Sequence, residues 1–172
     1  MNAITLLQEQ TRNTYGWVDK LVAPIPHDQW ETCPEGIESS ISWQVGHLTL
    51  SLYYHTVMVL HGRDPEIGKT LKLGEYTPWF NQGAPQDAAG KIVPAKLWDR
   101  WQAMQEYSLS GIGRLAPEEL EGPQVDVGFP HPVAQTKRGA IEWNIQHTAW
   151  HAGQISMIRR AVFGRYEFRE KA

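Results

Sequence analysis

The chain has 172 residues, a formal net charge of −3 and eight tryptophans among its aromatic side chains. A chain of this length buries roughly 70% of the surface that its unfolded form exposes, so we expect residues 1–172 to form a single globular domain. Sixteen lysines and arginines against nineteen acidic residues leave no basic excess, which argues against a nucleic-acid partner. The aromatic content argues equally against intrinsic disorder.

No membrane span is expected either, because the longest apolar stretch, residues 41–60, contains two histidines, two serines and a glutamine. The first ten residues lack a basic leader followed by a long apolar core, and we therefore expect a cytoplasmic protein. The single cysteine, Cys33, excludes an intrachain disulfide and a zinc cluster built from cysteines alone.

Four segments have the three- and four-residue spacing of apolar side chains that is typical of amphipathic helices. They span residues 4–22, 41–60, 94–115 and 137–163. Ser39 or Ser40 is suited to cap the second helix, and Pro94 is tolerated in the first turn of the third. Gly62 follows the second helix and Gly164 follows the fourth, as glycines often do at helix ends.

The second and third helices are separated by residues 62–93, a long segment with prolines and glycines scattered through it. A connection of this length within one domain usually covers a site or contains short helical turns. Strand signals are sparse throughout the chain. The sequence therefore predicts an all-α fold, a four-helix bundle with a long crossover between helices two and three.

Three histidines occupy related positions on the second and fourth helices. Aligning these helices with an offset of 100 residues places His47 and His147 at the same angle beside the apolar stripe, and His151 follows His147 by one turn. Three neutral imidazoles suit a divalent ion such as zinc or nickel and leave a coordination position open. The alternative is that these rings are hydrogen-bonded packing residues, which is the commoner role of a histidine beside a helix core.

The sequence around these histidines resembles the DinB/YfiT-like superfamily of metalloenzymes. Residues 147–155, HTAWHAGQI, are similar to its His-x-x-x-His-x-Gly-Gln-Ile signature, and residues 40–48, SISWQVGHL, are similar to its second-helix segment. The resemblance implies an up-down-down-up bundle in which His47, His147 and His151 hold one divalent metal ion.

The resemblance also implies a function: a metal-dependent enzyme that activates a thiol or water for attack on a small electrophile. It would act as a thiol S-transferase with a low-molecular-weight thiol as cosubstrate, or as a hydrolase. The alternative is a non-catalytic bundle that binds metal or senses a small ligand. A di-iron carboxylate site is disfavoured, because no Glu-x-x-His occurs in the chain.

Four polar residues lie within about one turn of the three histidines and are candidates to contact the metal ligands or the substrate. They are Gln44, Ser51, Asn144 and Gln154. Ordinary hydrogen bonding inside the bundle is the alternative for all four. Among the remaining histidines, we expect His55 to be buried and hydrogen-bonded, and His131 to be solvated in a loop.

A second apolar stripe runs along each of the two histidine-bearing helices, roughly opposite the first. Its members recur every seven residues: Trp43, Leu50 and Val57 on one helix, and Trp143, Trp150 and Met157 on the other. Such a stripe must be buried against something. A homodimer would cover it, and the alternative is coverage by the long crossover.

Overall fold

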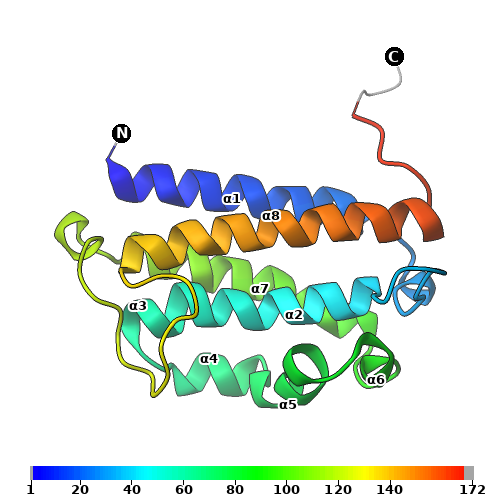
Figure 1. The fold of residues 1–172 in the computed structure, drawn as a ribbon, viewed down its shortest axis with the longest axis horizontal. Coiled ribbons are helices and arrows are strands. Elements are labelled where there is room, and N and C mark those ends of the chain that lie inside the picture. Colours follow the sequence, from blue (N-terminus) through cyan, green and yellow to red (C-terminus); the bar gives the residue numbers. More distant parts are fainter. Residues whose placement is uncertain (1, 169–172) are drawn as a thin grey trace.

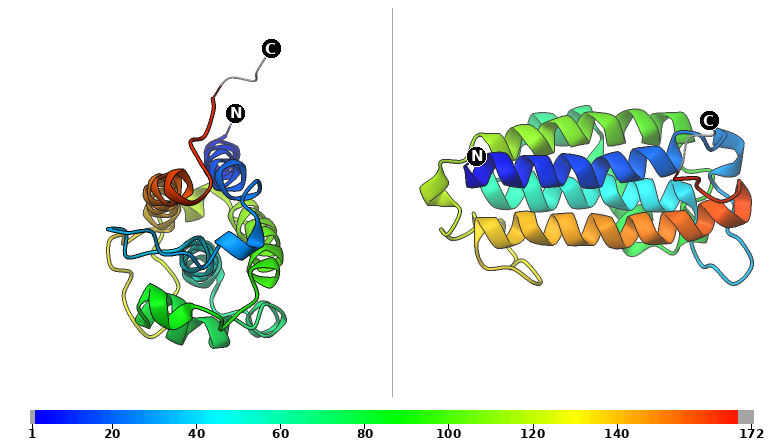
Figure 2. Two further views of the ribbon diagram at one scale, coloured as in Figure 1. Left: turned by 90° about the vertical axis from the view of Figure 1, so that its right-hand side faces the viewer. Right: turned by 90° about the horizontal axis from the view of Figure 1, so that it is seen from above.

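The computed structural model describes residues 2–168, and four long helices form its body (Figure 1). They are α1 (Ala3–Val22), α2 (Ile41–Tyr53), α7 (Pro94–Gly113) and α8 (Lys137–Val162). Helices α1 and α2 each pack against both α7 and α8, which closes a four-helix bundle (Figure 2). Within the described residues the only strand-like pairing is one isolated bridge between Pro123 and Thr136. The predicted all-α fold is confirmed.

Helices α1 and α8 run in one direction along the bundle, and α2 and α7 run in the other (Figure 1). A contact between the start of α1 and the end of α7 agrees with this arrangement. The Nε2 of Gln8, early in α1, donates to the carbonyl of Leu109, late in α7, over 2.9 Å. Because α2 and α7 start at the same end of the bundle, the crossover must return along its length.

The helix ends are set by the residues that the sequence suggested. Ser40 is the N-cap of α2, and its Oγ accepts a hydrogen bond from the backbone N–H of Trp43 over 3.2 Å. Pro94 is the first residue of α7. Gly62 and Gly164 follow the second and fourth helices with φ of +93° and +117°, a region of backbone space that favours glycine.

The second helix contains an irregularity that the sequence did not predict. Helix α2 continues into a π-helical segment, η2 (Tyr54–Met58), and then into a last turn, α3 (Val59–His61). Helix α7 approaches this segment so closely that a Cβ at Gly111 would lie 2.5 Å from the carbonyl oxygen of Thr56. π-Helical segments of this kind are frequent at functional sites, and η2 carries His55.

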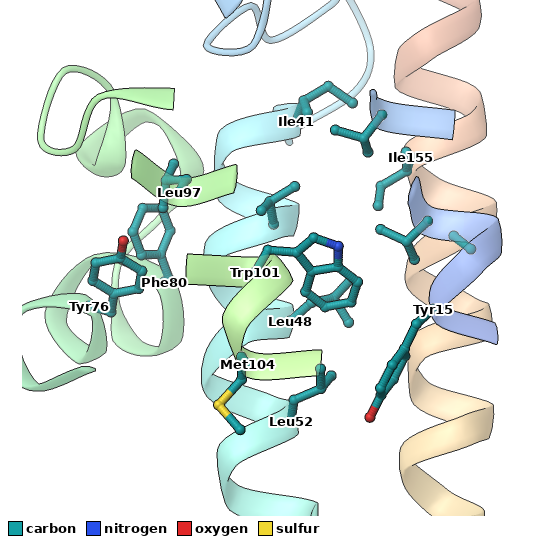
Figure 3. Close-up of a cluster of buried hydrophobic side chains, with 14 of the residues drawn as sticks. Tyr15, Ile41, Leu48, Leu52, Tyr76, Phe80, Leu97, Trp101, Met104 and Ile155 are labelled. Carbon is teal, nitrogen blue, oxygen red and sulfur yellow. The ribbon is translucent and has the colours of Figure 1, made fainter. Parts of the chain in front are cut away.

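The crossover folds into short helical turns that lie against the outer face of α2 (Figure 2). These are α4 (Pro65–Thr70), α5 (Leu73–Thr77), η3 (Pro78–Gln82) and α6 (Pro85–Ala88); two 3-10 turns elsewhere are η1 (His27–Gln29) and η4 (Pro117–Glu119). Tyr76 and Phe80 of the crossover are fully buried and pack into the core beside Leu97 (Figure 3). The crossover therefore extends the hydrophobic core beyond the four helices.

The second apolar stripe is covered on one helix only. On α2, Trp43 and Leu50 are partly buried and pack against the core. On α8, by contrast, Trp150 and Met157 are each 61% exposed. Among the described residues, no helix has both the length and the apolarity required to cross a bilayer.

Candidate metal centre

Three imidazole rings from α2 and α8 point their nitrogens at one another. The Nε2 of His147 lies 3.1 Å from the Nε2 of His151 and 3.5 Å from the Nε2 of His47. One ring nitrogen of each residue lies within 4.8 Å of the other two. Nitrogen ligands held about 2.0–2.1 Å from a tetrahedral zinc ion are separated from one another by roughly 3.3 Å. The spacing of these rings therefore suits a single ion between them.

The crossover fixes the ring of His47. Its Nδ1 donates to the carbonyl oxygen of Phe80 over 2.7 Å, and because a carbonyl only accepts, the proton of the neutral ring lies on Nδ1. The lone pair of Nε2 is thus directed toward the other histidines. The indole of Trp43 stacks on the ring at a centroid distance of 4.9 Å, which fixes its plane.

Gln44 holds His151 in the same tautomer. The Nδ1 of His151 donates to Oε1 of Gln44 over 2.5 Å. The amide orientation of Gln44 is itself set, because its Nε2 donates to Ser39 Oγ and to Gln154 Oε1, each over 2.8 Å. Gln44 and Gln154 thus lie where they orient a histidine, which is the usual role of residues behind a metal ligand.

His147 is held mainly by packing. Trp143 stacks on its ring at a centroid distance of 5.8 Å. Its Nδ1 is buried and has no hydrogen-bond partner among residues 2–168. The protein therefore does not fix the tautomer of this ring, unlike those of His47 and His151. Ser51 places a hydroxyl group beside the cluster, with its Oγ 3.4 Å from the Nε2 of His47.

Asn144, the fourth polar candidate, is not brought to these histidines. Its Nδ2 donates to Tyr15 Oη over 2.9 Å, and that oxygen lies 2.6 Å from Ser108 Oγ. All three side chains are fully buried between α1, α7 and α8. Position 144 belongs to the stripe of α8 that faces the core, one turn before Thr148, so its side chain enters the bundle and stabilises a polar contact there.

The histidines are held neutral by their surroundings. Burial, together with the smaller effect of the neighbouring imidazoles, lowers the pKa of His147 to about 4 and that of His151 to about 3. Burial also lowers the pKa of His47, although the hydrogen bond to Phe80 opposes this shift. Neutral imidazole is the form that binds a metal ion. Three neutral nitrogen donors match the preferences of zinc and nickel.

These pKa values make the stability of the metal-free protein depend on pH. Both values lie below the ordinary histidine value of about 6.5, so the unfolded chain takes up protons that the folded chain does not bind as the pH falls below that value. The contribution of the neutral His147 and His151 side chains to folding stability is complete above about pH 6.5 and is lost as the pH falls toward 4. In urea unfolding with a chelator present, we expect wild type to lose more stability between pH 7 and pH 5 than the double variant His147→Gln, His151→Gln. Equal losses would contradict the shifts.

Gln44 gives a direct test of the orienting hydrogen bond. Replacing Gln44 with leucine removes the acceptor of His151 Nδ1 and leaves that donor buried without a partner. Loss of such an orienting residue typically lowers metal affinity by about 10–100-fold. We expect this decrease for Gln44→Leu in a zinc titration against a chromophoric chelator, and no change for the exposed control Gln10→Leu. Unchanged affinity in Gln44→Leu would mean that His151 is oriented by other contacts.

A cavity of about 730 Å³ adjoins the histidines. His47, His147 and Ser51 lie in its wall, together with apolar side chains. The apolar group comprises Leu50, Met58, Leu73, Phe129 and Trp143. A small molecule in this cavity would therefore lie beside the converging nitrogens, which is the arrangement that a reactive site requires.

Two features of the site were missed from the sequence. The carbonyl of Phe80 belongs to the crossover, and no sequence spacing indicates that it reaches His47. The expectation for His131 was wrong: this ring is partly buried, and its Nε2 lies 2.8 Å from Nδ1 of His55. His55 is buried and hydrogen-bonded, as expected.

Comparisons with known proteins concern the family and the fold of this chain. The model of the DinB superfamily matches residues 10–155, a range that contains His47, His147 and His151. The fold is similar to that in the crystal structure of a conserved protein from Enterococcus faecalis, with a TM-score of 0.72 and 20% identity, over 96% of this chain and 99% of that chain. At this identity, the likeness concerns the fold alone. No curated protein matches the sequence. Because the family match spans most of its length, the chain belongs to the DinB superfamily.

Proposed function

We propose that the chain is a metal-dependent enzyme in which His47, His147 and His151 hold one divalent ion, zinc or nickel. The observation that supports this proposal is the convergence of three Nε2 atoms beside a cavity. A divalent ion bound there would act as a Lewis acid that makes a thiol or water a stronger nucleophile at neutral pH. Family membership is compatible with a metal-binding protein.

The reaction that we propose is attack of a thiol, or of water, on a small electrophile in the cavity. Ser51 lines the cavity and can orient the nucleophile through its hydroxyl. The chain's own thiol is not in place for this, because Cys33 is exposed and does not line the cavity. The thiol is therefore a separate low-molecular-weight cosubstrate. A substrate that fills the cavity and packs against its apolar walls displaces water, and this favours thiol transfer over hydrolysis.

The experiment is a turnover assay of zinc- or nickel-loaded protein with an aryl halide and an epoxide, with and without added cysteine. In thiol transfer, a carbon–sulfur bond forms as the halide leaves or the epoxide ring opens. We expect product only with metal present, and loss of product in His147→Ala and after chelation. His27→Ala, which removes an exposed imidazole outside the cavity, should keep full activity. Metal-loaded protein without turnover would favour the metal-binding or ligand-sensing alternative.

We also propose that the chain forms a homodimer through α8. Trp150 and Met157 lie two turns apart on one face and expose large apolar side chains. A dimer would remove this surface from water. We expect the mass measured by light scattering to correspond to two chains, and to fall toward one chain in the double variant Trp150→Glu, Met157→Glu. A monomeric wild type at high concentration would contradict the proposal.

A further inference from the structure

Two further histidines, His55 and His131, form a pair outside the three proposed metal ligands, and His55 is one of the residues that line the cavity. His55 lies on the π-helical segment η2 and is only 5% exposed. His131 lies in the loop before α8, and its Nε2 is 2.8 Å from Nδ1 of His55. Both rings are packed against Tyr54, whose side chain stacks on His131 at a centroid distance of 5.5 Å.

The hydrogen bonds of the loop determine which ring nitrogen carries each proton. The backbone N–H groups of Val133 and Ala134 both donate to Nδ1 of His131, over 3.2 and 2.9 Å. This nitrogen is therefore an acceptor, so the proton of the neutral ring lies on Nε2. That N–H then donates to Nδ1 of His55, and the proton of His55 must lie on its own Nε2.

The Nε2–H of His55 is left as an available donor. It has no hydrogen-bond partner within residues 2–168, and His55 is one of the residues that line the cavity. A polar donor at a largely apolar wall needs an acceptor, and a ligand in the cavity can supply one. The loop thus prepares a hydrogen-bond donor beside the proposed metal centre.

The charge around the cavity indicates the kind of acceptor. Arg63 lines the cavity and is tethered by a 3.0 Å hydrogen bond from its Nη2 to the carbonyl of Val127. No aspartate or glutamate is among the described residues that line the cavity. A cationic side chain without acidic neighbours in the same wall favours a negatively charged group.

Aromatic side chains form the walls around this donor and cation. Tyr54 and Phe129 stack on each other at a centroid distance of 5.5 Å and both line the cavity, and Trp143 lines it as well. Flat apolar walls of this kind favour a flat apolar ligand body.

We infer that the cavity binds a small aromatic carboxylate, with the Nε2–H of His55 as hydrogen-bond donor and Arg63 as the counter-charge. This inference deepens the proposed function, because it names the class of small molecule that enters the proposed active site. It assigns His55 a substrate contact and His131 a positioning role. Binding of the carboxylate at these groups does not require a metal ion.

The test uses full-length protein treated with a chelator, so that its outcome is independent of the metal site. Benzoate is titrated by calorimetry, with benzyl alcohol as the uncharged analogue. We expect benzoate to bind at least tenfold more tightly than benzyl alcohol, and Arg63→Met and His55→Ala each to weaken benzoate binding at least tenfold. Arg160→Met, an exposed arginine outside the cavity, should bind like wild type. Equal binding by Arg63→Met, or no preference for benzoate, would overturn the inference.

The positioning role of His131 has a spectroscopic readout. Long-range proton–nitrogen NMR spectra distinguish the two tautomers of His55, and we expect the Nε2–H form in wild type. In His131→Ala this preference should weaken together with benzoate affinity, while zinc content stays unchanged. A His55 ring protonated on Nδ1 in wild type would overturn the assignment, whatever the metal content.

Discussion

Replacing His151 with alanine is expected to abolish stable zinc or nickel binding while the four helices remain folded. The substitution removes one of three nitrogen donors, so the loss of affinity should exceed the roughly 10–100-fold typical of residues that only orient a ligand. It also leaves Oε1 of Gln44 without its 2.5 Å partner, at a cost of about 1–3 kcal/mol in stability. The measurement is elemental analysis after equilibration with excess metal and removal of the unbound ion, with circular dichroism to monitor helix content.

The matched control for this experiment is His27→Ala. His27 is an exposed histidine that packs against Trp30 and belongs neither to the histidine cluster nor to the cavity wall. We expect about one metal ion per chain in wild type and in this control, and almost none in His151→Ala. Equal metal contents in the wild type and His151→Ala would mean that the three histidines are packing residues and not metal ligands.

Gly46→Ala is expected to damage both stability and metal binding. A Cβ at position 46 would lie 2.5 Å from Cγ of Phe80, whose ring is fully buried against α2. The ring must shift, and overpacking of this kind costs about 1–3 kcal/mol. The backbone of Phe80 carries the carbonyl that accepts from His47, so its displacement should also lower zinc affinity by about tenfold or more.

Gly153→Ala is the matched control, because it adds the same methyl group to a helix. Nothing lies within 4 Å of a Cβ at Gly153, so this variant should be as stable as wild type or more stable by up to about 1 kcal/mol. Chemical unfolding and zinc titration of both variants are the measurements. Adding Phe80→Leu to Gly46→Ala should recover part of the lost stability. If Gly46→Ala matched Gly153→Ala in both measurements, the close contact with Phe80 would be disproved.

The helices could be predicted because their signals are local. Ser40 caps α2 through its own side chain, and Gly62 and Gly164 adopt backbone angles that end a helix. The π-helical segment η2 could not be predicted, because it packs closely against Gly111 of α7, a residue far away in the sequence. Apolar spacing alone describes a regular helix over the same residues.

The candidate site divides in the same way. A four-residue spacing places His147 and His151 one helical turn apart, and this could be read from the sequence. In the structure Gln44 contacts His151, and Gln154 contacts Gln44. Asn144 shows the limit of such angular arguments, since it lies on the core-facing stripe of α8 and its side chain binds Tyr15 inside the bundle.

The remaining parts of the site depend on contacts between distant segments. The Phe80 carbonyl reaches His47 only because the crossover folds back on α2. His131 meets His55 across 76 residues of chain. Neither contact leaves a periodic signal in the sequence, and each becomes visible only once the loops are placed on the bundle.

X-ray absorption spectroscopy of the zinc-loaded protein tests the central claim most directly. The three Nε2 atoms converge from two helices, and the cavity adjoins them on one side. We predict three imidazole nitrogens at about 2.0–2.1 Å from zinc, with the rest of the coordination sphere supplied by atoms that do not belong to the chain. Sulfur from Cys33, fewer than three imidazoles, or a fourth protein ligand that closes the site would contradict the account.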